Sequence, residues 1–165
     1  MRFHTLILAI LAATLTPTCL LAQQERTHSD RYSTVMLGQD TIRTAGGGMI
    51  LEERFIVSQF ADQEGSPMDK ITGHCWGSVI FQGGEIAVAA GGVCHMMDPE
   101  GNGYFSSYTW EKAFTEDCPI RCGSYRDSNG YGKFEGMTGN GRWNLTAELP
   151  GMSVMGRHQG TYVWR

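Results

Sequence analysis

Short apolar runs separated by glycine-rich turns constrain this chain more than any other feature. The sequence contains 22 glycines, and no segment keeps a 3.6-residue apolar period over three helical turns. The runs are bounded by Gly, Asn, Asp and Pro, which favour turns between strands. They span residues 32–37, 49–60, 75–81, 85–94, 104–110, 132–136, 141–149 and 160–165. The pattern predicts an all-β fold, in which only residues 111–117 could supply a helical turn.

About eight strands are enough to close a small antiparallel barrel, so we expect residues 31–165 to form a single barrel domain. The segment YGKFEGMTGNGRW, residues 131–143, fits this interpretation, because glycine within strands marks bulges, tight bends and close backbone approach. A phosphate-binding loop is not indicated, since a strand-like run follows the glycines where such a loop needs a helix.

The first 22 residues have the composition of a secretory signal peptide. Arg2 precedes a long apolar run, and the small residue Ala22 stands ahead of a polar pair. The uninterrupted apolar part, residues 5–15, is too short to span a bilayer comfortably. We therefore expect cleavage after Ala22, a loose polar arm over residues 23–30, no membrane insertion of the mature chain, and a secreted or periplasmic location.

The charge of the chain limits its partners. The formal net charge at pH 7 is −4, and no cluster of Lys and Arg is present to neutralise phosphates. Nucleic acids and anionic membrane surfaces are therefore not expected as partners. The sequence leaves the oligomeric state open.

Four cysteines follow the expected cleavage site, and an even number in an exported chain favours disulfides over free thiols. Three pairings are possible. We prefer Cys75–Cys94, which would join two neighbouring strands, with Cys118–Cys122, which would close a small loop.

Two groups of residues match metal sites in part. His74 and His95 each stand beside a cysteine, as in a Cys2His2 zinc centre, but the spacing fits no zinc-finger pattern. Asp98, Glu100 and Asn102 alternate as in the first half of a calcium loop, but the acidic residue that should end the loop is replaced by Thr109. Disulfides and a hairpin turn are the preferred interpretations, and no metal site is predicted.

Three segments together resemble a group of small exported bacterial proteins: GHCWG at residues 73–77, GGVCHMMDPEGNGYF at 91–105 and YGKFEGMTGNGRW at 131–143. The last is similar to the glycine-rich strands of the allene oxide cyclase and dirigent barrels. The resemblance implies an eight-stranded antiparallel barrel of calycin-like shape with a cavity. The wider group includes cofactor-free cyclases and proteins that hold apolar molecules. None of the cyclases' catalytic carboxylates matches a position here.

Candidate functional residues come from the strands. No G-x-S-x-G, H-E-x-x-H or P-loop motif is present, and no cofactor is expected. Glu52 and Glu53 are adjacent in a strand, so one must face the interior of a closed barrel, where it could act as a general acid or base. The aromatic residues that could line a ligand pocket, or simply fill the core, are Trp76, Tyr104, Tyr108, Trp110 and Trp143, with Phe105 and Phe134 beside them.

Three functions are consistent with these features. The chain could bind a small, largely apolar molecule in the mouth of the barrel. It could be a cofactor-free cyclase or isomerase using the same cavity, so whether it is an enzyme stays open. It could also be a structural or partner-binding secreted protein with a packed interior.

Overall fold

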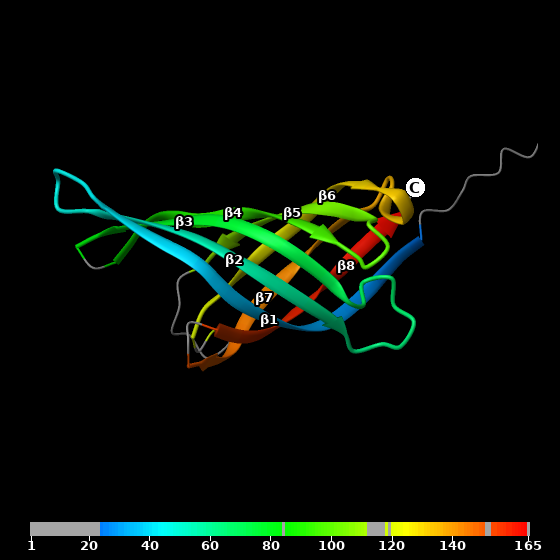
Figure 1. Ribbon diagram of the computed structural model, residues 1–165. Helices are drawn as coiled ribbons and strands as arrows, with labels where there is room; N and C mark the ends of the chain where they lie inside the picture. The colour runs from blue at the N-terminus through cyan, green and yellow to red at the C-terminus, as the bar shows by residue number, and fades with distance from the viewer. Residues whose placement is uncertain (1–23, 84, 112–117, 119, 151–152, 165) are drawn as a thin grey trace, which may run out of the picture.

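The computed structural model describes residues 24–83, 85–111, 118, 120–150 and 153–164. These residues form eight strands and one short 3-10 helix: β1 (Gln24–Arg43), β2 (Met49–Ala61), β3 (Ile71–Gln82), β4 (Glu85–Met97), β5 (Gly103–Trp110), β6 (Cys122–Tyr131), η1 (Gly132–Phe134), β7 (Thr138–Leu149) and β8 (Ser153–Trp164). Each strand pairs antiparallel with the next, and β8 pairs with β1 (Figure 1). The predicted all-β single antiparallel barrel of eight strands is confirmed.

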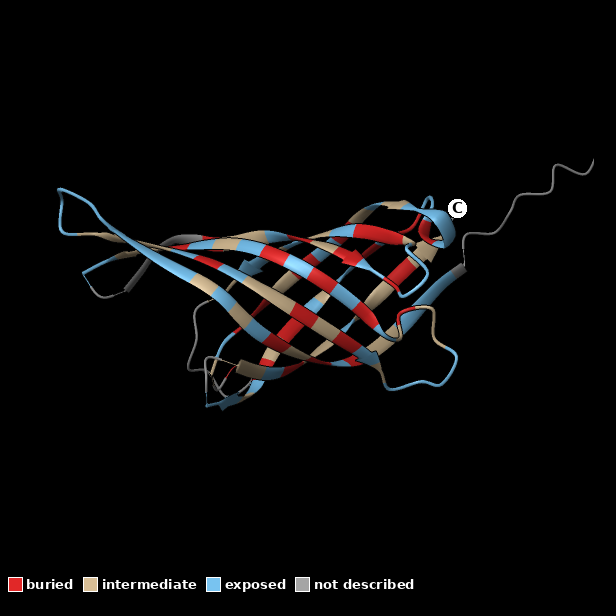
Figure 2. Cartoon of the chain, in the orientation of Figure 1, coloured by how far each residue is buried: buried red, intermediate tan, exposed pale blue. Residues whose placement is uncertain are grey.

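Alternate side chains of each strand face the interior of the barrel, as the two-residue period of a strand requires. On β3, Ile71 and Cys75 are buried, whereas His74 and Trp76 between and beyond them are exposed. Figure 2 shows the same alternation of buried and exposed positions along the other strands. The core therefore lies inside the barrel.

One end of the barrel is filled by apolar side chains. Met68, Ile71, Phe134 and Met137 are all at most 1% exposed. The helix η1 that carries Phe134 lies beside the end of β8 (Figure 1), where the Trp164 indole donates to the Lys133 carbonyl at 3.1 Å.

Four strands extend beyond the closed part of the barrel at the opposite end (Figure 1). β1 pairs with β8 only as far as Val35, and β4 pairs with β5 only from Gly91. The β1–β2 and β3–β4 pairs continue past these points, as far as Arg43–Met49 and Gln82–Glu85. The barrel wall is therefore much taller on the side formed by β1 to β4.

Three stretches differ from the sequence expectation. Residues 24–30, expected as a loose arm, form the first part of β1 and pair with β8; their polar side chains enter a strand because part of the barrel interior is itself polar. The first strand does not end at Gly38, which follows a bulge inside β1. Residues 132–136 form η1 and a turn where a strand was expected, and the strand lies instead at Cys122–Tyr131, where none was expected. Gly132 and Gly136 have φ values of 63° and 73°, a left-handed conformation that favours glycine.

Two other expectations fall on residues that the structure does not describe, namely the signal peptide over residues 1–22 and the helical turn over residues 111–117, of which only Glu111 is described. Among the described residues, no helix has the length and hydropathy needed to cross a membrane.

Candidate functional site: a cavity inside the barrel

A cavity of about 140 Å³ lies inside the barrel. Every strand contributes to its wall, because each strand turns one face inward. Most of the lining is apolar, and it includes the aromatic side chains of Tyr32, Phe55, Tyr104, Tyr108, Trp110 and Trp143. A smaller set of polar side chains interrupts this surface: His28, Thr34, Glu53, Gln59, Ser106, Arg121, Asp127 and His158.

Glu53 and Tyr108 belong to one row of cross-strand partners. The pairings Glu53–Gly77, Gly77–Gly92 and Gly92–Tyr108 run from β2 to β5. A Cβ atom on either glycine would overlap the Tyr108 hydroxyl. Because neither glycine has a side chain, the Tyr108 side chain can lie across β4 and β3 towards β2.

Glu53 is buried, with 6% of its surface exposed. Burial raises its pKa, while the positive charge of Arg121 and a hydrogen bond of 3.3 Å from Gln39 act to lower it. Burial and the nearby charge of Glu53 raise the pKa of Tyr108. The Tyr108 hydroxyl is a buried atom with no hydrogen-bond partner among the described residues.

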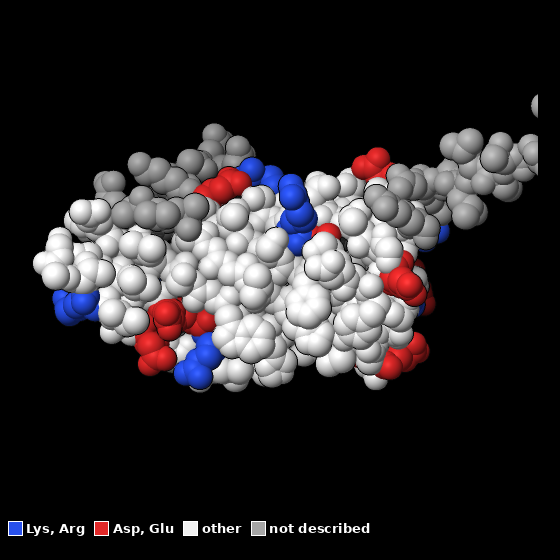
Figure 3. All heavy atoms as spheres, turned by 90° about the horizontal axis from the view of Figure 1, so that it is seen from above, with Lys and Arg blue, Asp and Glu red and all other residues white. Residues whose placement is uncertain are grey.

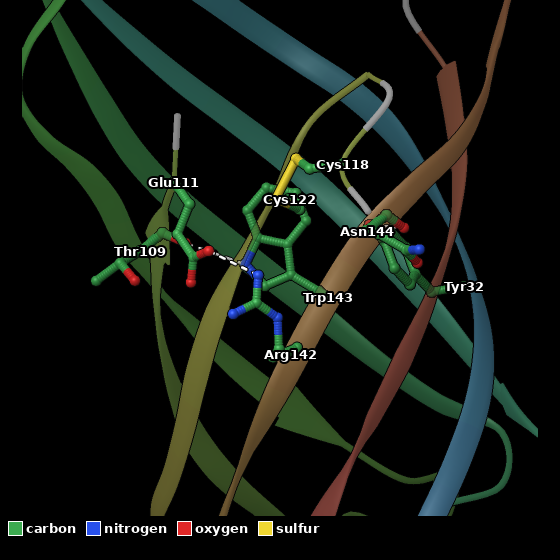
Figure 4. Close-up of a disulfide and its surroundings, with 8 residues drawn as sticks. All are labelled: Tyr32, Thr109, Glu111, Cys118, Cys122, Arg142, Trp143 and Asn144. Carbon is green, nitrogen blue, oxygen red and sulfur yellow. Dashed lines mark hydrogen bonds and ion pairs between the residues drawn. A yellow bond between two sulfur atoms is a disulfide. The ribbon is translucent and has the colours of Figure 1, made fainter. Parts of the chain in front are cut away.

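Trp110 and Trp143 are held in place near this part of the cavity. Their rings meet edge to face at 6.2 Å between centroids, and the Arg121 guanidinium lies 4.8 Å from the Trp110 ring centroid. The Trp143 indole donates to the Thr109 carbonyl at 3.2 Å. Figure 4 shows the Trp143 ring close to the Cys118–Cys122 disulfide, with the Arg142–Glu111 ion pair beside it.

A hydrogen-bonded chain of polar side chains occupies another part of the interior. The Tyr125 hydroxyl lies 2.6 Å from Nε2 of His28, whose Nδ1 contacts the Asp30 carboxylate. Gln59 donates to the same Asp30 oxygen, Oδ2, at 2.7 Å. Since a carboxylate only accepts, Nδ1 of His28 carries a proton. The chain fixes the His28 ring against the cavity.

Asp127 places a second carboxyl group on the cavity wall. It lies opposite Ser106 in the β5–β6 pairing and is 3% exposed. Burial raises its pKa to about 6, and the charge of Asp30 acts in the same direction, against a hydrogen bond from Ser106 and the charge of His28. A carboxyl group with this pKa exchanges its proton near neutral pH, as a general acid or base must.

His158 on β8 is a half-buried imidazole on the cavity wall. Its ring stacks on Tyr32 at 4.4 Å and lies 5.2 Å from the Tyr125 ring. Burial lowers its pKa to about 3, and the positive charge of His28 contributes. At neutral pH this side chain is therefore uncharged and packs as an aromatic ring.

The structure brings together four of the five predicted ligand-binding residues. Tyr104, Tyr108, Trp110 and Trp143 all line the cavity. Trp76 does not, because it is on the outer face of β3 and is 50% exposed.

The two predicted glutamates lie on opposite faces of β2: Glu53 faces the cavity and Glu52 faces outward. Phe105 on β5 is also outside, whereas Phe134 is in the core. Part of the outer surface of the barrel is largely uncharged (Figure 3).

Both preferred disulfides are present. Cys75–Cys94 joins cross-strand partners on β3 and β4, and both residues line the cavity. Cys118–Cys122 closes the short loop before β6. Because strand neighbours point to opposite faces, His74 and His95 lie outside the barrel and away from the cysteines.

The Asp98 loop is a hairpin turn. The Asp98 carboxylate accepts hydrogen bonds from the backbone amides of Glu100 and Asn102, each at 2.9 Å, and pairs with the Lys133 ammonium at 2.7 Å. The described residues contain no group of three or more His, Cys, Asp or Glu side chains arranged to hold a metal ion.

The sequence analysis missed the polar part of the site. His28 and Asp30 fall in the segment expected as an arm. Asp127 lies on β6, where no strand was expected, and His158 lies on β8 ahead of the last expected strand, residues 160–165. A signal was present in residues 28–34, where His28, Asp30, Tyr32 and Thr34 alternate with other residues. That two-residue period is typical of a strand with one buried face.

No protein-family model matches the chain, and the comparison with curated proteins gives no match. Among solved structures, the chain is similar to the pterocarpan synthase dirigent protein GePTS1, with a TM-score of 0.48 and 10% sequence identity over 87% of this chain and 86% of that chain. The fold that the sequence resemblance implied, an eight-stranded antiparallel barrel with a cavity, is the one this chain adopts.

Proposed function

We propose that this protein binds a small, largely apolar molecule inside its barrel. The observation that carries the proposal is the cavity of about 140 Å³, walled mainly by aromatic, aliphatic and sulfur-containing side chains. Ligand sites in proteins have this composition, with a few polar groups that fix the orientation of the ligand. An interior that is not filled favours ligand binding over a purely structural role.

The size of the cavity limits the ligand. An engineered apolar cavity of about 150 Å³ admits benzene, whereas drug-sized molecules occupy pockets of roughly 300–1,000 Å³. We therefore propose a ligand of one or two small rings, or a short chain of similar volume. Indane, a compact bicyclic hydrocarbon, is a suitable first probe.

Titration with indane tests this proposal. Binding should change the emission of Trp110 and Trp143, which line the cavity. Val57→Phe should abolish the response, because Val57 is buried in the cavity wall, and Val93→Phe is the matched control because Val93 is 52% exposed outside the barrel. If indane leaves the emission and heat of mixing of the folded wild type unchanged, the proposal is wrong.

The location is also proposed. Disulfides persist in oxidising compartments, and the two in this chain support a secreted or periplasmic protein released by cleavage after Ala22. Intact mass measurement of protein isolated from its own host tests this. A mature chain starting at Gln23 is expected, and a chain retaining Met1 would contradict it.

A second candidate function is that of a cofactor-free cyclase or isomerase. The observation in its favour is that two carboxyl groups, Glu53 and Asp127, line the same cavity as the apolar side chains. Native mass spectrometry would first identify any small molecule that copurifies. Incubation of that molecule with the protein in heavy water should then give a rearranged or deuterated product, and Asp127→Asn or Glu53→Gln should slow its formation. Recovery of the molecule unchanged would leave binding as the function.

A further inference from the structure

Tyr108 and Glu53 form a polar subsite within the cavity. The cross-strand partners Glu53, Gly77, Gly92 and Tyr108 form one row over β2 to β5. Because the two glycines have no side chains, the Tyr108 ring can extend along this row, and its hydroxyl oxygen lies against Gly77, the direct partner of Glu53. The hydroxyl and the carboxyl group thus face the same part of the cavity. Both residues line it.

The Tyr108 hydroxyl lacks a hydrogen-bond partner in the part of the chain that the structure describes. Buried polar groups are nearly always paired, and an unpaired one lowers stability. The Glu53 carboxyl accepts one hydrogen bond, from Gln39, through Oε1. No hydrogen bond to its second oxygen is found among the described residues, and the phenolic O–H has no acceptor there.

We infer that the bound molecule carries a hydroxyl group, which accepts a hydrogen bond from Tyr108 and donates one to Glu53 while its apolar body occupies the rest of the cavity. This inference rests on the proposed binding function. A hydroxyl group is the simplest group that does both, because it has one donor and two acceptor lone pairs.

Other polar groups fit this subsite less well. A carbonyl oxygen only accepts hydrogen bonds. It can therefore pair with the Tyr108 hydroxyl, but its other lone pair faces the Glu53 carboxylate, with no proton between the two oxygens. An ammonium group only donates, so it leaves Tyr108 unpaired. It would also meet the positive charge of Arg121, which acts on Glu53 in the same region.

The test compares indane with 2-indanol, which differ by one hydroxyl group. The measured quantity is the ratio of the indane Kd to the 2-indanol Kd, obtained by calorimetry on the full mature protein. In the wild type we expect 2-indanol to bind more tightly. In Tyr108→Phe the ratio should fall by about tenfold, the scale of one hydrogen bond of about 1.4 kcal/mol, while indane binding is retained.

Matched controls separate the subsite from general effects on the barrel. Tyr131→Phe removes a hydroxyl from the outer surface, where Tyr131 pairs with His95, and should leave the ratio unchanged. Glu53→Gln should lower the ratio, whereas Glu52→Gln, one residue away on the outer face, should not. Tyr108→Phe should also raise the melting temperature of the ligand-free protein, since it removes an unpaired buried group.

The outcomes distinguish the two proposals. If indane binds but the ratio is the same in the wild type and in Tyr108→Phe, the hydroxyl subsite is wrong and apolar binding stands. If neither compound binds to the folded wild type, both proposals are wrong. If the ratio falls in Tyr108→Phe and in Glu53→Gln and holds in both controls, the subsite is established.

Discussion

The Tyr125 hydroxyl on β6 lies within hydrogen-bond distance, 2.6 Å, of Nε2 of His28 on β1, across 97 residues of sequence. Nδ1 of the same imidazole contacts Asp30, so both ring nitrogens of His28 are paired inside the barrel. This contact ties the first strand of the barrel to the sixth across the interior. It also places an imidazole, with its orientation fixed, in the wall of the cavity.

Tyr125→Phe should destabilise the fold. The change keeps the ring but leaves Nε2 of buried His28 without its partner, which costs about 1–3 kcal/mol. Urea unfolding should show a lower midpoint with an unchanged slope. Tyr131→Phe, which removes a hydroxyl from the outer surface, is the control and should change the midpoint far less. An equal loss in both variants would contradict the role of the His28 contact.

Ionisation of Asp127 should lower the free energy of unfolding as the pH rises. Its pKa is raised from 3.8 to about 6 by burial, so its contribution is fully present below about pH 4 and is lost as the pH rises through 6. In Asp127→Asn this loss is absent. The free energy of unfolding of the variant relative to the wild type should therefore increase by on the order of 3 kcal/mol between pH 4 and pH 7.

Urea unfolding at a series of pH values measures this difference for Asp127→Asn. The difference is the useful quantity because His158 titrates in an overlapping range with the opposite sign. Asp40→Asn, at an exposed carboxylate on β1, is the control and should give a nearly constant difference. A constant difference for Asp127→Asn would show that this carboxyl group has an ordinary pKa.

His158 should make the fold sensitive to acid. Its pKa is lowered from 6.5 to about 3, mainly by burial. Between these two pH values the imidazole is therefore protonated in the unfolded chain and neutral in the folded chain. Stability is therefore lost as the pH falls from about 6.5 towards 3, by on the order of 4 kcal/mol. His158→Phe keeps an aromatic ring against Tyr32 and should flatten this decline, whereas His74→Phe on the outer surface should not. Parallel declines in the wild type and His158→Phe would refute this.

The mature protein should contain two disulfides and no free thiol. Reduction should raise the intact mass by the mass of four hydrogens, two for each bond. Peptide mapping without reduction should recover the pairs Cys75–Cys94 and Cys118–Cys122. Alkylation of any of these cysteines in unreduced, denatured protein would contradict the expected state.

Much of the fold could be predicted because its determinants are local. Strand periodicity and turn residues indicate an antiparallel barrel of about eight strands, although residues 132–136 were counted as a strand in place of β6. Cys75 and Cys94 could be paired in advance, because two strands joined by a tight hairpin are neighbours. Glu52 and Glu53 show the limit of prediction from local sequence. Because they are adjacent in a strand, one of them must face inward, but the sequence does not indicate which one.

The polar half of the site could not be predicted, because it depends on closure of the barrel. His28 and Asp30 lie in a segment whose composition suits a solvated arm, and they become buried only because β1 pairs with β8 from the other end of the chain. Tyr125 and Asp127 reach the same interior from β6. No local pattern encodes these contacts.

The sequence by itself determined the fold class, the expectation of export and a preferred pairing of the four cysteines, all of which follow from neighbours along the chain or across one hairpin. Only the tertiary structure decided which face of each strand lies inside. That decision placed Trp143 in the cavity and Trp76 in solvent, and brought Tyr108 across Gly92 and Gly77 towards Glu53. The physical reason is that the direction of a side chain depends on register and closure, which are properties of the whole sheet.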